Sequence, residues 1–318
     1  MQEERHFSFT DFRKKVLNSL SRIFTQFGIV KDKVFELEKH ISLLLTEQLP
    51  SSISLREIKK FYENSDEEKL IFFHLLAEIE PSQLELLFNQ IYAYEDTPQW
   101  LINLREDLLN FKNRIPSEAF KKLDGVFKDY FSKIFNFQYL KLKVCDPDST
   151  SIKILKYIAE KEGVHPSKHW WTFERRLQSP DRIVLALEHF KMPGVPVVYV
   201  EIALSKGLVR KTSQIFEREK PVNVKKADTA IFYSINTTFR GLSGAGLGRR
   251  MIIKAKEYLK NKYPKICLFA TLSPLPKFRS YLETILKDNK KSLFKLKRED
   301  IDKNLYEFFK KKEIRNLT

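Results

Sequence analysis

Glycine is distributed very unevenly along this chain, and its distribution divides the chain into two parts. Only two of the nine glycines, Gly28 and Gly125, precede residue 135, and the other seven lie between Gly163 and Gly248. Glycine is used where the backbone turns tightly or takes a left-handed conformation. A stretch of this length with so few glycines favours continuous helices, and the second part is expected to contain more special turns.

The first part shows apolar residues at helical spacing, separated by short segments with proline, serine or aspartate. The predicted helices cover residues 9–27, 30–49, 67–79, 83–92, 99–111 and 119–135. Several of the separating segments place a serine, threonine or aspartate where a helix N-cap is needed, and Pro98 fits a first helical position. We expect residues 1–134 to form an all-α helical bundle.

After residue 135 the apolar pattern changes to that of an α/β unit. Residues 195–204 (VPVVYVEIAL) are apolar at nearly every position and rich in β-branched side chains, as in a strand buried on both faces. The other predicted elements are a strand at 138–144, a helix from 149 to 162, a strand at 230–239, a helix at 249–262 and a strand at 266–272. The expected fold is therefore α+β, with an α/β domain over residues 135–318.

A glycine-rich loop joins the strand at 230–239 to the helix that follows it. Residues 240–250 read RGLSGAGLGRR. Without Cβ atoms the backbone amides can approach an anion closely, and the helix N-terminus adds unpaired N–H groups and a positive dipole end. A pyrophosphate suits this arrangement, and Arg249 or Arg250 could add charge-assisted hydrogen bonds. The residues predicted to bind such a ligand are Ser243, Gly244, Ala245, Gly246, Leu247, Gly248 and Arg249.

Three known phosphate loops can be compared with this segment. A P-loop needs Lys-Ser/Thr after its last glycine, where this chain has Arg249-Arg250, and a dinucleotide loop needs GxGxxG, whose spacing GAGLG does not have. The third is the acyl-CoA loop of the GNAT acetyltransferase superfamily. Gly246-Leu247-Gly248 resembles that loop, although Ser243 stands where glutamine or arginine is usual. The alternative to a ligand site is a tight turn with close packing of helix and strand.

The net charge of +16 admits nucleic acid, an anionic membrane surface or a polyanionic small molecule as partner. The lysines are scattered, and no zinc-ligand spacing or aromatic RNA-binding signature accompanies them, so we expect no nucleic-acid partner. No apolar stretch approaches the length of a membrane span, and the start lacks a secretory signal. With two cysteines and no CxxC spacing, a cytoplasmic protein is expected.

Further stretches make the prediction more specific. They are GVHPSKHWWTFERRL at 163–177, SPDR at 179–182, MPGVPVVYVEIALSKGL at 192–208, ADTAIFYSI at 227–235, GLSGAGLG at 241–248 and TLSPLPKF at 271–278. In this order and spacing they resemble the catalytic domain of the malonyl-CoA decarboxylase family. Residues 104–109 and 130–140 are similar to the end of that family's helical domain, so the resemblance covers about residues 100–282.

The resemblance implies a helical domain used for oligomer contacts, followed by a GNAT-like domain that binds malonyl-CoA. It also implies decarboxylation to acetyl-CoA and CO2 by a serine and a histidine, with no metal or organic cofactor. The family's serine, in a Leu-Ser-Pro motif, matches Ser273. The residues themselves agree, because Ser273 follows the carboxyl end of a predicted buried strand beside the glycine loop, where ligands gather in α/β folds.

The family's histidine has no counterpart at the expected place. It lies in an Asn-Phe-His-like motif downstream of the serine, whereas the last of this chain's six histidines is His189 and the sequence after Leu282 is lysine-rich. The α/β domain is therefore expected to lack its last strands. His165 and His189 are interpreted as architectural and His169 as a surface residue. Tyr233 or a water could protonate an enolate, but nothing in the sequence selects either.

Four functions follow from these observations. The first is an active malonyl-CoA decarboxylase with another acid in place of the histidine. The others are a truncated, inactive CoA-binding relative, a GNAT-type acyltransferase acting on an amine, and a basic nucleic-acid-binding protein.

Overall fold

The computed structural model describes residues 31–46, 51–166, 169–209, 211–216, 220–272 and Ser280. The chain divides into two compact units, Met1–Leu272 and Ser273–Thr318. All the helices and strands among the described residues from 31 to 272 lie in the first unit. The predicted helix at 9–27, Ser273 and the expected loss of the last strands lie outside the described residues.

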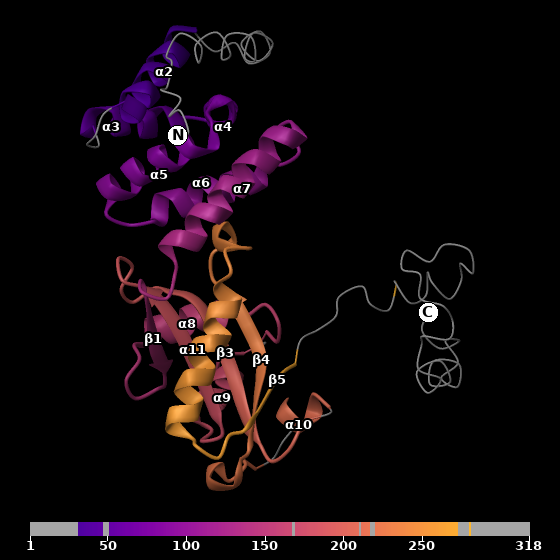
Figure 1. The fold of residues 1–318 in the computed structure, drawn as a ribbon. Helices are drawn as coiled ribbons and strands as arrows, with labels where there is room; N and C mark the ends of the chain where they lie inside the picture. Colours follow the sequence, from indigo (N-terminus) through magenta and orange to yellow (C-terminus); the bar gives the residue numbers. More distant parts are fainter. Residues whose placement is uncertain are drawn as a thin grey trace, which may run out of the picture. The chain divides into compact units, whose positions relative to one another are not determined.

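The first part of the unit is helical throughout (Figure 1). Its helices are α2 (Lys31–Thr46), α3 (Ser52–Tyr62), α4 (Asp66–Glu78), α5 (Pro81–Glu95), α6 (Gln99–Asn110) and α7 (Ser117–Ile134). Ser51 and Ser65 cap α3 and α4 by accepting hydrogen bonds from backbone N–H groups of the first turn. The predicted helices are confirmed where the structure describes them, and α3 is an addition that the sequence pattern did not predict.

The second part is a mixed sheet with helices on both faces. Among the described residues the sheet has the strand order β1 (Leu140–Cys145), β2 (Arg182–His189), β3 (Pro196–Ser205), β4 (Thr229–Thr237) and β5 (Leu268–Thr271). Neighbouring strands are antiparallel from β1 to β4, and β4 and β5 are parallel. The shorter elements are α8 (Ile152–Glu160), α9 (Trp170–Gln178), α10 (Ser213–Phe216), η1 (Val224–Lys226) and η2 (Arg240–Leu242), and the long helix is α11 (Leu247–Lys262).

The two faces of the sheet are covered by different helices. On one face α11 packs its buried residues, such as Met251 and Leu259, into a core shared with Val200 and Phe232. On the other face α8 and α9 pack against side chains of β2 and β3 that include Tyr199. Every residue of β3 is buried, so the prediction of a strand covered on both faces is confirmed. The predicted α+β class, with helices first and a mixed sheet second, is confirmed as well.

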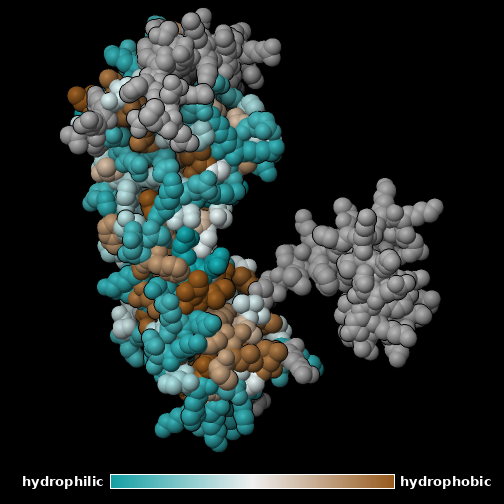
Figure 2. Space-filling model, in the orientation of Figure 1, coloured by the Kyte–Doolittle hydropathy of each residue, from teal (hydrophilic) through white to brown (hydrophobic). Residues whose placement is uncertain are grey.

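The strand before Ser273 differs from the prediction. β5 was expected to be buried, but in the described part of the chain its residues are exposed or half-buried. It pairs with β4 on one side only among these residues. Figure 2 shows hydrophobic surface over the region of β4 and β5. Strand β2 and helix α9 are further elements that the sequence pattern did not predict.

His189 links the helical part to the sheet. It is completely buried, and its Nε2 lies 3.0 Å from the carbonyl oxygen of Ile134, at the end of α7. The backbone N–H of Lys191 donates to Nδ1, so the proton resides on Nε2. The centroid of its ring also lies 4.8 Å from the centroid of the Phe135 ring. The architectural role expected for His189 agrees with this geometry.

Two other expectations are limited by what the structure describes. The division into domains 1–134 and 135–318 stays a prediction, because helices and sheet share one compact unit. As for membranes, no helix in the described part of the chain is both long and apolar enough to cross one.

Candidate functional site

The glycine loop connects β4 to α11 as predicted. Gly244 and Gly246 both have φ of +78°, in the left-handed region that side chains disfavour. Ser243, Gly244, Gly246 and Arg249 are exposed, whereas Ala245 and Leu247 pack into the core and offer a ligand only their backbone groups. The loop therefore turns a short run of backbone outward at the start of a helix of 16 residues.

The outward backbone carries free donors. Among the described residues no hydrogen-bond acceptor is found for the amide N–H of Gly244 or for those of residues 246–249. The N–H groups of Ser243 and Ala245, by contrast, bond within the loop, to Arg240 and Leu242. Free N–H groups together with the positive end of the α11 dipole attract an anion such as a phosphate.

The two arginines after the loop have different environments. The guanidinium of Arg250 donates from Nη1 to the carbonyl oxygen of Ala245 at 2.6 Å, and from Nη2 to the backbone and side-chain oxygens of Ser132, both at 3.0 Å. Arg250 thus ties the loop to α7. Arg249 is exposed, and its place among the predicted binding residues stays a prediction.

Arg105 holds the backbone of the glycine loop in place through hydrogen bonds. It is 1% exposed, and its Nη1 donates to the carbonyl oxygens of Gly241 at 2.6 Å and Ser243 at 2.7 Å. Its Nε and Nη2 donate to Oδ1 of Asp124 on α7. Burial alone would raise the pKa of Asp124, but hydrogen bonds from Lys128 and Arg105 hold it below its ordinary value. The helical part of the chain therefore shapes the loop.

Gly241 is required by a close approach to α6. A Cβ atom there would lie 2.3 Å from the carbonyl oxygen of Ile102, closer than real contacts allow. The Gly241 N–H donates to the Glu106 carboxylate at 3.1 Å. Sequence reasoning assigned neither this contact nor that of Arg105, although residues 104–109 were part of the family resemblance.

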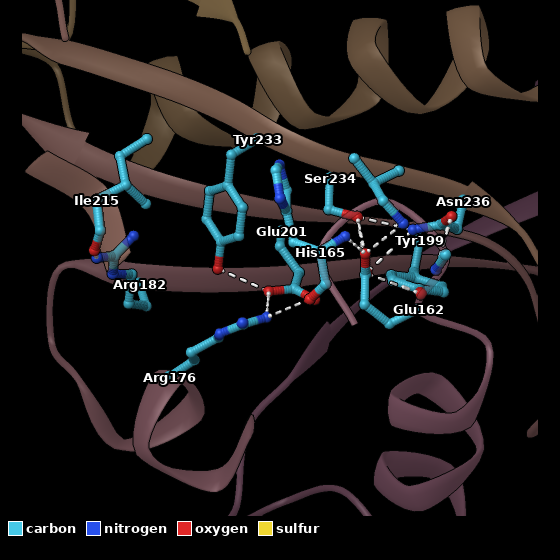
Figure 3. Close-up of polar contacts among 12 residues, drawn as sticks. Glu162, His165, Arg176, Arg182, Tyr199, Glu201, Ile215, Tyr233, Ser234 and Asn236 are labelled. Carbon is cyan, nitrogen blue, oxygen red and sulfur yellow. Dashed lines mark hydrogen bonds and ion pairs between the residues drawn. The ribbon is translucent and has the colours of Figure 1, made fainter. Parts of the chain in front are cut away.

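A second polar cluster lies on the sheet face that α8 and α9 cover (Figure 3). At its centre is Glu162, which follows α8 and is buried. Its carboxylate accepts hydrogen bonds from the N–H groups of Val164 and His165, the hydroxyls of Tyr199 and Ser234, and the amide of Asn236, at 2.7–3.0 Å. Burial would raise the pKa of Glu162, but these donors outweigh it and lower the pKa.

Glu201, on β3, is the other acid of the cluster and is completely buried. The hydroxyl of Tyr233 lies 2.7 Å from its Oε2, and Nη1 of Arg176 lies 3.4 Å from the same oxygen. Burial, together with the charge of Glu162 and against that of Arg176, raises the pKa of Glu201 to about 7. The two carboxyl groups are therefore held in different states near neutral pH, because Glu162 is ionised and Glu201 is about half protonated at pH 7.

A basic cavity of about 490 Å³ opens beside this cluster. Arg176 and Tyr233 line it, together with Phe216 of α10. Its other basic residues are Arg175, Arg182 and Lys220. The cationic side chains can attract a carboxylate. The buried acid and the phenol beside them can exchange a proton with that carboxylate or with its product.

The cavity is close to the end of the described strand β5. Leu272, the residue before Ser273, donates its N–H to the carbonyl oxygen of Phe232 at 2.8 Å and packs in one apolar cluster with Ile231 and Tyr233. Ser273 itself lies outside the described residues. The sequence signal that could have pointed to this cluster is Glu201, a lone acid within an otherwise apolar strand.

Family models match nearly the whole described chain. A model described as the malonyl-CoA decarboxylase N-terminal domain matches residues 50–135, and one described as the malonyl-CoA decarboxylase C-terminal domain matches residues 138–316. The second match includes the lysine-rich segment after Leu282.

Single proteins agree with the models. The chain is 30% identical over 205 residues to a mitochondrial malonyl-CoA decarboxylase of Mus musculus and 29% over 212 residues to that of Anser anser anser, covering 63% and 65% of this chain. The chain spans 41% and 42% of the length of these relatives.

Solved structures match over more of their length. The malonyl-CoA decarboxylase of Rhodopseudomonas palustris shares the fold with a TM-score of 0.67 at 24% identity, over 95% of this chain and 75% of that one. The enzyme of Agrobacterium vitis has a TM-score of 0.58 at 25% identity, over 91% and 72%.

Proposed function

The chain belongs to the malonyl-CoA decarboxylase family, and from this premise we propose that it binds malonyl-CoA and converts it to acetyl-CoA and CO2. The observation that carries the proposal is the glycine loop before a long helix, because its N–H groups at Gly244 and at residues 246–249 have no acceptor among the described residues. CoA carries a pyrophosphate, and such a loop is suited to it. The residues proposed to bind it are Ser243, Gly244, Ala245, Gly246, Leu247, Gly248 and Arg249.

The rest of the CoA molecule can extend from the loop toward the cavity. The pantetheine arm separates the pyrophosphate from the thioester, and the carboxyl end of β4 separates the loop from Tyr233. A malonyl group at the end of the arm would enter that cavity as an anion.

The reaction sets two requirements on the site. Loss of CO2 leaves an electron pair on the thioester as an enolate, so the thioester oxygen needs a hydrogen-bond donor and the α-carbon needs a proton. We assign the first task to the hydroxyl of Ser273, which follows Leu272 at the end of β5. The chemistry needs neither a metal nor an organic cofactor.

The test is release of CO2 from malonyl-CoA by the purified chain. Ser273→Ala is expected to lower the rate by about 100-fold or more, the usual effect of removing one such donor. Ser82→Ala, at an exposed serine of α5, is the matched control and should keep the rate. Thermal stabilisation by CoA without any CO2 release would instead indicate a CoA-binding relative that does not turn over.

We also propose that the helical part mediates a homo-oligomer. Ile53 and Leu86 on this part are 62% and 53% exposed, and a large apolar side chain in such a position suits a partner surface. Light scattering of the wild type and of an Ile53→Asp, Leu86→Asp double variant tests this. A monomeric wild type would contradict the proposal.

A further inference from the structure

We propose that Tyr233 gives the product enolate its proton, and that Glu201 behind it holds the proton in reserve. This inference rests on the proposed decarboxylase function. It assigns a proton donor within the described residues to a reaction for which the sequence selected none.

The position of Tyr233 between a buried acid and the cavity supports this assignment. Tyr233 is one of the residues that line the cavity, its side chain is 1% exposed, and its oxygen lies 2.7 Å from Oε2 of Glu201 (Figure 3). Glu201 itself has no exposed surface. A proton on Glu201 can therefore reach the cavity through the phenol oxygen.

The surroundings of Glu201 raise its pKa to about 7, so that a substantial share of Glu201 keeps its proton near neutral pH. The charged and titratable groups that face it are Glu162 after α8, Arg176 on α9 and Tyr233 on β4. Burial and the negative charge of Glu162 oppose ionisation more strongly than Arg176 favours it. Its Oε1 is buried without a hydrogen-bond partner among the described residues. This buried position destabilises the neutral, protonated form of Glu201 less than the charged form, because burial penalises the charge.

The cavity suits the substrate that this proton would serve. The malonyl carboxylate is an anion, and Arg176 and Arg182 both line the cavity, with the guanidinium of Arg182 5.5 Å from the centre of the Tyr233 ring. Tyr233 also shares an apolar cluster with Leu272, the residue before Ser273. Leu272, which follows β5, and Tyr233 on β4 are thus neighbours.

The proton transfer balances in two steps. First, the bond between the α-carbon and the carboxylate breaks, CO2 leaves, and the electron pair remains as the thioester enolate. The enolate carbon then takes the proton from the Tyr233 oxygen while Tyr233 takes one from Glu201, so that the 2.7 Å hydrogen bond reverses its direction. Glu201 is left ionised and regains a proton from water that enters the cavity after the products leave.

Exchange of hydrogen at the product's methyl group isolates this step from CO2 release. An enzyme that protonates the enolate of acetyl-CoA must also remove a proton from acetyl-CoA in the reverse direction. The wild type in D2O is therefore expected to introduce deuterium into the acetyl methyl group. Tyr233→Phe should lower both the exchange and the decarboxylation about 100-fold or more, the usual contribution of general acid–base catalysis.

Tyr130→Phe is the matched control. Tyr130 on α7 is 2% exposed and its hydroxyl donates to Oδ1 of Asn89 at 3.0 Å, but Tyr130 does not line the cavity. It should lose similar thermal stability and keep exchange and turnover. Binding of CoA should be unchanged in both variants. Equal losses of activity in the two variants, or unchanged exchange in Tyr233→Phe, would overturn the role of Tyr233.

The role of Glu201 is tested by the pH profile of turnover. In the wild type the rate should fall as pH rises through about 7, where Glu201 loses its proton. Glu201→Gln keeps a side chain of the same shape and should show a lower rate without this decline. A decline that persists in Glu201→Gln would overturn the reserve role. A wild type that releases no CO2 contradicts the decarboxylase itself, whereas an active Tyr233→Phe enzyme contradicts the relay alone.

Discussion

The Nη1 atom of Arg105, on α6, lies 2.6 Å from the carbonyl oxygen of Gly241 in the glycine loop. The same guanidinium is almost completely buried and is held in place by Asp124 on α7. Two helices of the first part of the chain therefore determine the backbone shape of a loop more than 100 residues later in the sequence. Stability of the helical part and ligand binding by the loop should change together.

Arg105→Met is expected to reduce the free energy of unfolding by about 3 kcal/mol or more. The substitution leaves Asp124 without its arginine partner and two carbonyl oxygens of the loop without a donor. Denaturant unfolding measures the loss. Arg114→Met is the control, since the side chain of Arg114 is 44% exposed and 3.9 Å from Glu67, a contact worth well under about 1 kcal/mol. Equal losses in both variants would contradict the supporting role of Arg105.

Gly241→Ala and Gly125→Ala should have opposite effects on stability. An added Cβ at Gly241 meets the backbone oxygen of Ile102 at 2.3 Å, so the loop or α6 must move, at a cost of about 1–3 kcal/mol. At Gly125, within α7, a Cβ meets nothing within 4 Å, and alanine should stabilise the helix by about 0.5–1 kcal/mol. Thermal unfolding of the two variants provides the comparison. A Gly241→Ala protein as stable as the wild type would show that the contact with α6 is not restrictive.

Most of the helices and strands β3 and β4 were predictable because each carries an apolar pattern of its own. Strand β3 is one example, an apolar run that is buried at every residue. Helix α3 was missed although Leu55, Ile58 and Tyr62 recur at helical spacing on its buried face. Strand β2 has the sequence RIVLALEH, whose leucine, alanine and glutamate also suit a helix. Its state is decided by pairing with β1 and β3, which no local pattern reveals.

The candidate site also has one part that the sequence predicts and one part that it does not. The glycine loop was predictable from contiguous residues, because its chemistry is that of the backbone and of a helix start. The cluster at Glu162 was not, since the acid meets Ser234 and Asn236 more than 70 residues away. The sequence also allowed either Arg249 or Arg250 to contact a phosphate, although only Arg249 was placed among the predicted binding residues. Only the contacts of Arg250 with Ala245 and Ser132 separate them.

The stability of the chain should fall at acidic pH through His189. Burial lowers the pKa of His189 from 6.5 to about 4, opposed by its hydrogen bond to Ile134. The unfolded chain then binds a proton more readily than the folded one. The contribution of neutral His189 to the free energy of unfolding is therefore complete above about pH 6.5 and is lost as pH falls toward 4. The shift corresponds to about 3 kcal/mol.

His189→Gln tests this pH dependence, because glutamine does not titrate and retains an N–H donor. Denaturant unfolding at pH 7 and at pH 4.5 should show a smaller decrease in the free energy of unfolding for the variant than for the wild type. The same decrease in both proteins would assign the acid sensitivity to other groups.

Substitution of the two arginines after the loop should separate ligand binding from loop stability. Arg249 is exposed at the start of α11, so Arg249→Met should leave the free energy of unfolding within about 0.5 kcal/mol of the wild type. If Arg249 contacts a phosphate of CoA, its loss removes a charge-assisted hydrogen bond and should weaken CoA binding about 10-fold or more. Arg250→Met removes the bonds to Ala245 and Ser132 and should lower both stability and affinity. Calorimetric titration with CoA, together with thermal unfolding, measures both effects. Unchanged CoA affinity in Arg249→Met would place the phosphates on the backbone of the loop alone.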